Sequence, residues 1–268
     1  YRAAKSEVDW LNDSLGSFYQ QEWFDDVLRI IKGGKEASVY LCEASPTTRR
    51  KYLAAKVYRP RRFRELKNDT LYREGRVRLD EDGNTIINGG MHHAMNKGTG
   101  YGRKLMHTSW IEHEVRTLRI MHQAGADVPE PIISGHNAIL MDYIGSPEMA
   151  APTLNTVKLA REEARPLFDR VMTNVGLMLD HDRIHGDLSA FNILYWEGEI
   201  TLIDFPQAIS PRTNRNSFQI FRRDIRRICE YFAGQGVESD PYKIAVKFWT
   251  DRGLRITPDV HPGLLDDQ

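Results

Sequence analysis

The feature that most constrains this chain is a polar segment in its second half, which brings three oxygen-bearing side chains close together in sequence. Asp187, Asn192 and Asp204 fall within eighteen residues, at separations of five and then twelve. In this order one carboxylate can accept the proton of a hydroxyl group, while the amide and the second carboxylate hold a metal ion beside a nucleotide. The apolar run 200–203 predicts a strand that ends at Asp204. The segment therefore predicts phosphoryl transfer from a magnesium nucleotide.

The composition permits a sizeable core and favours no special class of partner. The chain has 268 residues, of which 41% are hydrophobic, and this suits one large domain or two small lobes. Its 37 basic and 37 acidic residues cancel, so the net charge indicates no particular partner. No apolar run approaches the length of a membrane span, and the start shows no signal peptide. We therefore expect no membrane contact.

The two cysteines, Cys42 and Cys229, are far apart and lack the spacing of metal ligands. We expect neither a disulfide framework nor a zinc site. Two reduced thiols are typical of a cytoplasmic protein, and we expect that location.

Hydrophobic periodicity predicts strands in the first half of the chain and helices in the second. The pattern predicts one or two short helices within 8–28, a strand–turn–strand unit over 30–41, strands at 53–58 and 138–145, and helices at 110–122, 160–179, 218–232 and 242–250. Strands followed by helices favour an α+β protein with two lobes that divide near Gly145.

Residues 59–107 are polar and show little periodicity. They predict a long loop, and a loop of this length inside a compact domain is usually functional or disordered.

The turn over 33–38 allows two interpretations. It is not a Walker motif, because Glu36 and then a strand follow Gly34-Lys35, and it is not a G-x-G-x-x-G loop. A tight turn between strands can bring backbone amides, Lys35 and Ser38 near phosphates. The same residues can also form an ordinary hairpin.

Lys56 lies in the middle of a predicted strand, where a lysine either faces solvent or is held for a partner. Glu114, on the predicted helix 110–122, is the partner we prefer, because Ile111 and Leu118 place it near the buried stripe of that helix. Glu112 is the competing choice. A strand lysine paired with a helix glutamate positions nucleotide phosphates in kinases.

Two further features have structural alternatives. His185 lies beside the polar segment, but we interpret it as a structural hydrogen-bonding residue rather than a catalytic one. A basic cluster follows Asp204, and its members are Arg212, Arg215, Arg222, Arg223, Arg226 and Arg227. It forms either a solvated helix face paired with Asp224 and Glu230 or a patch for an acidic, phosphorylated or RNA-containing substrate.

With these motifs in order, the chain resembles the RIO family of atypical serine/threonine kinases, and most the branch whose phosphate loop reads Gly-Lys-Glu-Ala-x-Val-Tyr. The matching segments are Gly34–Tyr40, Trp110–Glu114, Pro129–Pro131, Ile184–Leu194, Leu202–Gln207, Asn216–Phe218 and Phe221–Asp224. The likeness extends over most of the chain, and we expect a prokaryotic source.

The resemblance implies a trimmed protein-kinase fold with an antiparallel-sheet N-lobe, a mainly helical C-lobe and an ATP site between them. As a single kinase-like domain over 1–268, the chain would consist of an N-terminal helical extension (1–28), an N-lobe (29–144) and a C-lobe (145–268). The stretch 59–107 would be the family's flexible loop, which can carry autophosphorylation.

The resemblance also implies the roles of individual residues. Asp187 would be the catalytic base, and Asn192 and Asp204 would bind magnesium or manganese. Asp204 could also accept the phosphoryl group itself and form a phosphoenzyme that water hydrolyses. The implied nucleotide-binding residues are Lys56, Glu114, Lys35 and Ser38, together with Asp142 and Ile144, whose backbone would meet the adenine.

Three functions follow as hypotheses. The first is an ATP-dependent serine/threonine protein kinase or ATPase that acts on a protein substrate the sequence does not identify. The second is a small-molecule phosphotransferase of the aminoglycoside or choline kinase type, because these enzymes share the His-Gly-Asp-Leu and Ile-Asp-Phe motifs. The third is an assembly factor that binds RNA or ribosomal particles and uses ATP as a switch.

Overall fold

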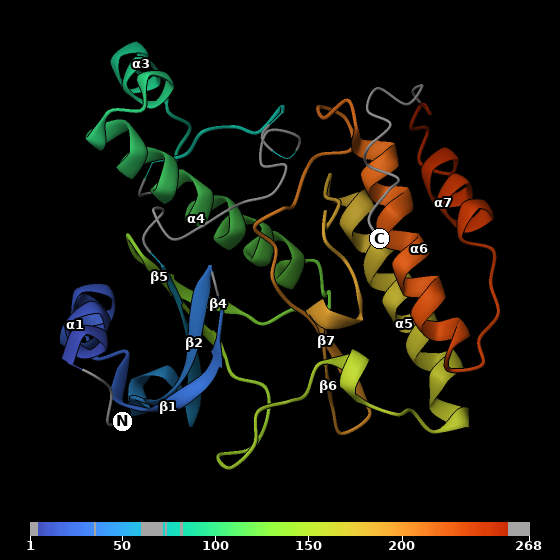
Figure 1. Cartoon of the computed structure of the whole chain (residues 1–268), viewed down its shortest axis with the longest axis horizontal. Helices are drawn as coiled ribbons and strands as arrows, with labels where there is room; N and C mark the ends of the chain where they lie inside the picture. Colours follow the sequence, from blue (N-terminus) through green and yellow to red (C-terminus); the bar gives the residue numbers. More distant parts are fainter. Residues whose placement is uncertain (1–4, 35, 60–71, 73, 81–82, 257–268) are drawn as a thin grey trace. The chain divides into compact units, whose positions relative to one another are not determined.

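A computed structural model describes residues 5–34, 36–59, 72, 74–80 and 83–256 (Figure 1). The chain forms two compact units that interleave in sequence. The first unit consists of Tyr1–Leu66, Val77–Arg116 and Pro129–Ala150, and the second of Lys67–Arg76, Thr117–Val128 and Ala151–Gln268. Among the described residues, no helix is long and apolar enough to cross a membrane.

The first unit is built on a five-stranded antiparallel sheet with the strand order β1-β2-β3-β5-β4. The strands are β1 (Phe24–Gly33), β2 (Ala37–Ala44), β3 (Tyr52–Tyr58), β4 (Pro131–Ser134) and β5 (Ala138–Asp142). A 3-10 turn, η1 (Pro46–Thr48), connects β2 to β3. The antiparallel sheet expected for the first lobe is thereby confirmed.

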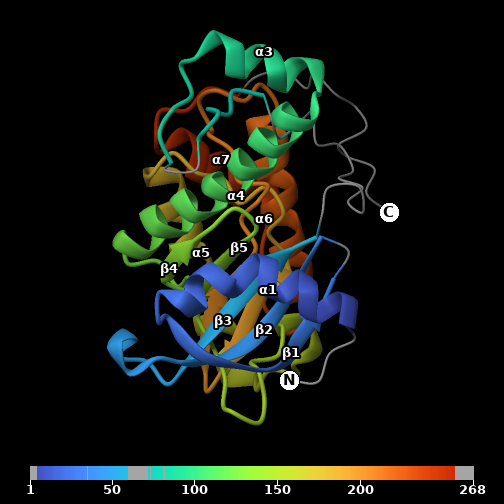
Figure 2. The same cartoon turned by 90° about the vertical axis from the view of Figure 1, so that its left-hand side faces the viewer.

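One face of this sheet is covered by helix α1 (Lys5–Gln20), which lies across it in Figure 2. The core on this face contains Leu11, Leu15, Phe18, Leu53, Ala55 and Val57. These β3 residues alternate with others that point the opposite way, because neighbouring side chains of a strand face opposite sides of the sheet.

The first residues of β1 correct the expectation of a helical segment over 8–28. Helix α1 ends at Gln20, and the sheet begins at Phe24. Phe24 is buried and pairs with Ala44 of β2. Pairing with a distant strand decides this conformation, and local periodicity could not reveal it.

The other face of the sheet packs against helix α4 (Gly100–Gln123), whose residues up to Arg116 belong to the first unit. Ala54 and Tyr58 of β3 lie in one cluster with Ile111 and Val115 of α4. Lys56 stands between these two β3 residues and therefore points to the same face.

The long loop expected over 59–107 is wrong in its second half. Helix α3 (Gly89–Lys97) lies there, and α4 already begins at Gly100 rather than near Trp110. The Asn88 side chain caps α3 by accepting hydrogen bonds from the backbone of Gly90 and Met91. This cap allows a helix whose hydrophobic pattern is weak. Residues 60–71, 73 and 81–82 lie outside the described part of the chain.

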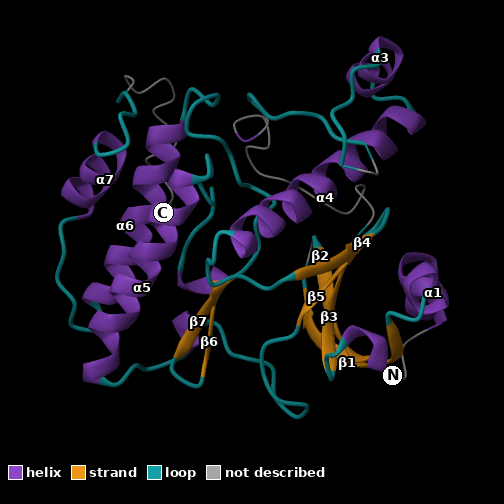
Figure 3. Ribbon diagram, turned by 180° about the vertical axis from the view of Figure 1, so that it is seen from behind, coloured by secondary structure: helices purple, strands orange, loops and turns teal. Residues whose placement is uncertain are grey.

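The second unit combines a short hairpin with a group of helices. The hairpin is β6 (Ile193–Trp196) paired with β7 (Glu199–Leu202), and the long helices are α5 (Arg161–Asp180), α6 (Ser217–Ala233) and α7 (Pro241–Thr250). The three helices run side by side in Figures 1 and 3. Two 3-10 turns, η3 (Leu154–Thr156) and η4 (Ala190–Asn192), complete this unit. The predicted helices and the strand before Asp204 are confirmed.

Candidate active site

Lys56 and Glu114 form a buried ion pair in the first unit. The Lys56 Nζ atom lies 2.6 Å from Glu114 Oε1, and the two side chains are 12% and 1% exposed. The Tyr58 hydroxyl donates to the other carboxylate oxygen of Glu114. Glu112, the alternative partner, instead accepts a hydrogen bond from Ser134 Oγ at 2.9 Å. The predicted pairing of Lys56 with Glu114, rather than with Glu112, is confirmed as a structural contact.

The turn between β1 and β2 is held by an arginine that the sequence did not single out. Arg59 donates from Nε to the carbonyl oxygen of Gly34 at 2.7 Å and from Nη2 to Ser38 Oγ at 3.2 Å. Ser38 is fully buried. Lys35 lies outside the described residues. The structure thus shows a fixed turn, and phosphate binding by its residues stays a prediction.

Asp142 is the last residue of β5, and Ile144 lies just beyond it. The Asp142 carboxylate accepts from Arg50 Nε at 2.7 Å and from the backbone of Glu130 at 3.0 Å. These contacts engage the side chain of Asp142 and fix the strand end. Ile144 is half-buried two residues beyond the strand. Adenine contact by this backbone stays a prediction.

Asp187 is presented to solvent by the second unit. Its side chain is 51% exposed, and Arg227 Nη1 of α6 lies 3.0 Å from its Oδ1. The Asn192 side chain donates to the Asp187 carbonyl at 2.8 Å and to Oδ2 at 3.2 Å. A half-exposed carboxylate held from two sides can accept a proton from a bound hydroxyl group.

Asn192 and Asp204 stand at the same end of the β6–β7 hairpin. Asn192 directly precedes β6, and Ile203, beyond β7, donates its backbone N–H to the Asn192 carbonyl at 2.9 Å. Asp204 has a left-handed backbone with φ of 72°, which aspartate tolerates better than most residues.

This donor set fits a divalent cation. The Asn192 amide nitrogen faces Asp187, so its amide oxygen is the atom that could bind a metal, together with the Asp204 carboxylate. One or two protein carboxylates plus substrate phosphates are the usual ligands of magnesium. No group of three or more His, Cys, Asp or Glu side chains in the described part of the chain forms a fuller metal cage.

Gly186, immediately before Asp187, is clamped through its backbone. Its N–H donates to Asp224 Oδ2 at 2.8 Å, and its carbonyl accepts from Arg223 Nη2. It has φ of 83°, and a Cβ atom there would lie 2.2 Å from the Gln207 carbonyl oxygen. Only glycine therefore fits this turn, which fixes the direction of the chain into Asp187.

The residues around this clamp are buried. Asp224 is 2% exposed and Arg223 is 7% exposed. Burial raises the pKa of the Asp224 carboxyl, and the neighbouring Arg223 guanidinium opposes that rise. The basic cluster is therefore not one uniform solvated face, because Arg223 serves the Gly186 turn and Arg227 pairs with Asp187.

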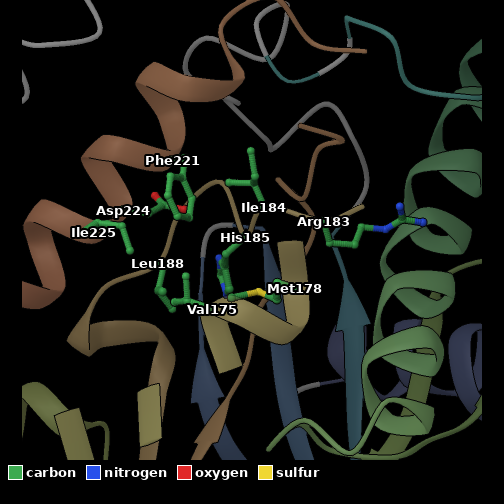
Figure 4. A pocket seen from close by; sticks show the side chains of 9 residues that line it. All are labelled: Val175, Met178, Arg183, Ile184, His185, Leu188, Phe221, Asp224 and Ile225. Atoms are coloured by element: carbon green, nitrogen blue, oxygen red, sulfur yellow. The ribbon is translucent and has the colours of Figure 1, made fainter. Parts of the chain in front are cut away.

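His185 has a structural environment, as expected. Its Nε2 lies 3.0 Å from the Ile203 carbonyl oxygen, and its ring lies 4.5 Å from that of Phe205. With Asp224 it lines a cavity of about 10 Å³ (Figure 4). That space suits a single water molecule and is far too small for a nucleotide.

Comparison with known proteins places this geometry in a family. The family model described as RIO domain matches residues 38–244, which is more than half of the chain. The chain belongs to the RIO family. The RIO family implies ATP and a divalent metal in general terms, and this finding does not favour the small-molecule phosphotransferase hypothesis.

Curated relatives carry RIO kinase names. The chain is 28% identical over 84% of its length to human serine/threonine-protein kinase RIO1, of which it covers 36%, and 30% identical over 84% to that of Chaetomium thermophilum, of which it covers 43%. It is 28% identical over 53% of its length to the RIO-type serine/threonine-protein kinase Rio1 of Haloferax volcanii, of which it covers 48%. The chain thus spans less than half the length of these relatives.

Among solved structures, the kinase PK-1 of Cydia pomonella granulovirus is similar with a TM-score of 0.42 and 13% identity, over 72% of this chain and 56% of that one.

Proposed function

We propose that this RIO-family chain transfers the terminal phosphoryl group of ATP to serine or threonine hydroxyl groups of proteins, its own included. The observation that carries the proposal is the presentation of Asp187. Its exposed carboxylate is held by Asn192 and Arg227, and Asn192 shares one hairpin end with Asp204.

In this proposal the second unit performs the chemistry. Asp187 orients the acceptor hydroxyl and accepts its proton. Asn192 and Asp204 hold magnesium or manganese, which neutralises charge on the phosphates when bound. Arg227 keeps the Asp187 carboxylate directed, because the two side chains form an ion pair at 3.0 Å.

The first unit would bind the nucleotide. Lys56 contacts the phosphates, and Glu114 holds the ammonium group in place from a buried position. Lys35 and Ser38 contribute from the turn between β1 and β2, and the backbone at Asp142 and Ile144 meets the adenine. Positioning and electrostatics would supply most of the rate.

Slow ATP hydrolysis through a phosphorylated Asp204, as part of a switch on ribosomal particles, is a finer form of the same proposal. It is supported by the RIO family match and by exposed arginines such as Arg212 and Arg215.

A cytoplasmic location is likewise proposed, supported by the two free buried thiols, Cys42 and Cys229.

The test is incubation of the purified chain with radiolabelled ATP and magnesium, followed by mapping of the labelled residues. We expect label on serine or threonine, and Asp187→Ala should lower transfer by about 10²–10⁴-fold while ATP binding persists. Asp251→Ala is the matched control, because Asp251 is 54% exposed and pairs with Lys247 on the surface of α7. Near-normal transfer in Asp187→Ala would refute the proposal.

A further inference from the structure

Tyr72, Glu74, Gly75 and Arg76, called here the docked segment, belong to the second unit although the sequence predicts them to lie in a long loop. The segment lies along the chain that follows Asp204. The Thr213 hydroxyl donates to the Gly75 carbonyl and the Asn214 amide to the Glu74 carbonyl, each at 3.3 Å. The docked segment therefore has defined backbone contacts on this unit.

The end of the docked segment holds the turn after Asp204. Arg76 Nη2 donates to the carbonyl oxygens of Pro206 at 2.9 Å and of Ala208 at 3.0 Å. One guanidinium group thus joins two carbonyls within four residues of the proposed metal ligand. Hydrogen bonds to charged donors are among the stronger ones in proteins.

The start of the docked segment reaches the turn before Asp187. The Tyr72 side chain is 6% exposed, and its hydroxyl accepts from Arg223 Nη1 at 2.8 Å. The same guanidinium lies 5.9 Å from the Tyr72 ring centre and donates its other nitrogen, Nη2, to the Gly186 carbonyl. Tyr72 therefore positions Arg223, and Arg223 in turn holds the Gly186 turn in place.

The two turns also touch each other, because Gly186 packs directly against the backbone of Gln207. We propose that the docked segment positions both carboxylates of the site, Asp204 through Arg76 and Asp187 through Tyr72 and Arg223. Its residues are positioning residues that contact neither nucleotide nor metal. The kinetic part of this inference rests on the proposed kinase function, whereas the structural part does not.

Gly75 offers a selective way to displace the docked segment. Its φ is 73°, and a Cβ atom there would lie 2.6 Å from the Thr213 carbonyl oxygen. Gly83 is the matched control: its φ is 77°, but the nearest atom to an added Cβ is Glu112 Oε2 at 3.6 Å. Both alanine variants carry the strain of a left-handed backbone, and only Gly75→Ala also clashes with the docking surface.

Hydrogen exchange tests the docking without any need for activity. Ile184 and Ile209 exchange backbone hydrogen bonds at 2.8 and 3.0 Å, and Ala208 donates its N–H to Phe205 at 3.0 Å. Gly75→Ala should speed exchange at these amides by about tenfold or more, since local opening controls exchange, and Gly83→Ala should leave it near wild type. If Gly75→Ala does not fold, Arg76→Ala takes its place. Unchanged exchange in the folded variant would overturn the inference.

Kinetics distinguish positioning from simple loss of stability. Tyr72→Phe and Arg76→Ala should lower kcat by about 10–100-fold, as outer contacts of metal sites commonly do, with little change in the KM for ATP. Arg76→Ala should also raise the magnesium concentration that gives half-maximal transfer, and Arg76→Lys should recover part of both effects. Wild-type kcat and magnesium dependence in both variants would contradict the inference. If the wild-type chain itself transfers no phosphate, the proposed function fails, and hydrogen exchange still decides the docking.

Discussion

The two units organise charged side chains in opposite ways. In the first unit, Lys56 and Glu114 are nearly buried and rely on each other and on Tyr58. In the second unit, the Asp187 side chain is half exposed, and its position comes from the backbone turn at Gly186. The first site is fixed by paired charges of its own side chains, and Asp187 by the main-chain turn that Arg223 and Asp224 clamp.

The difference follows from what each arrangement must avoid. A buried charge without a partner strongly destabilises a fold, so the Lys56–Glu114 pair stabilises the first unit only while both residues are present. An exposed carboxylate is hydrated and needs no partner for stability, but it needs a rigid base to be directed. Stability should therefore be sensitive to the charges of the Lys56–Glu114 pair and to the backbone of the Gly186 turn, and far less to the charge of Asp187.

Gly186→Ala should have the largest effect on the free energy of unfolding. The added Cβ would lie 2.2 Å from the Gln207 carbonyl, so the turn must move or the unit must open. We expect a loss of more than about 4 kcal/mol in the free energy of unfolding, as for other severe steric changes, together with loss of phosphoryl transfer. Denaturant titration and the autophosphorylation assay measure the two effects.

The matched control for this variant is Gly198→Ala, in the turn of the β6–β7 hairpin of the same unit. Gly198 has φ of 85°, and no atom lies within 4 Å of an added Cβ. It should lose only about 1–2 kcal/mol, the cost of a left-handed backbone. If the two variants were equally stable, the close contact between Gly186 and the Gln207 backbone would not be important for the second unit.

Glu114→Ala should have the next largest effect on stability. It leaves the Lys56 ammonium and the Tyr58 hydroxyl without their shared acceptor, and breaking a buried pair in this way costs about 3–5 kcal/mol. The variant Lys56→Met, combined with Glu114→Ala, should recover a large part of that loss, because it also removes the Lys56 charge that has lost Glu114 as its acceptor. A double-mutant cycle by denaturant titration measures the coupling, and additive losses would show that the charges do not depend on each other.

Features with a strong local signal could be predicted from the sequence. Helices α5, α6 and α7 have sustained apolar periodicity, and the structure places their ends within a few residues of the prediction. The Lys56–Glu114 pair could also be predicted, but only with the strand-lysine and helix-glutamate pattern of kinases; the position of Glu114 relative to Ile111 and Leu118 then favours it over Glu112. The helices needed only neighbours along the same helix, whereas the pair also needed that pattern.

Features that depend on distant contacts could not be predicted. Arg223 is one of several arginines in α6, and its contacts with Tyr72 and Gly186, 151 and 37 positions away, make it a buried bridge. The docked segment shows no periodicity, and it is held by single hydrogen bonds with side chains and backbone carbonyls far away in the sequence. Phe24 belongs to a strand because Ala44 pairs with it. These features could not be predicted because the residues in contact are far apart in the sequence, and not because of their residue types.

Asp187→Asn should have the smallest effect on stability, although it removes the proposed base. Because the Asp187 side chain is 51% exposed and Arg227 is 25% exposed, water can solvate the arginine when the carboxylate is replaced. Exposed ion pairs contribute about 0–1 kcal/mol, so the free energy of unfolding should fall by no more than that, whereas kcat should fall by about 10²–10⁴-fold. Denaturant titration of this variant beside Glu114→Ala, with transfer assays on the same samples, gives the contrast directly. A destabilisation of Asp187→Asn as large as that of Glu114→Ala would mean that the fold around Asp187, too, depends on the charge of that side chain.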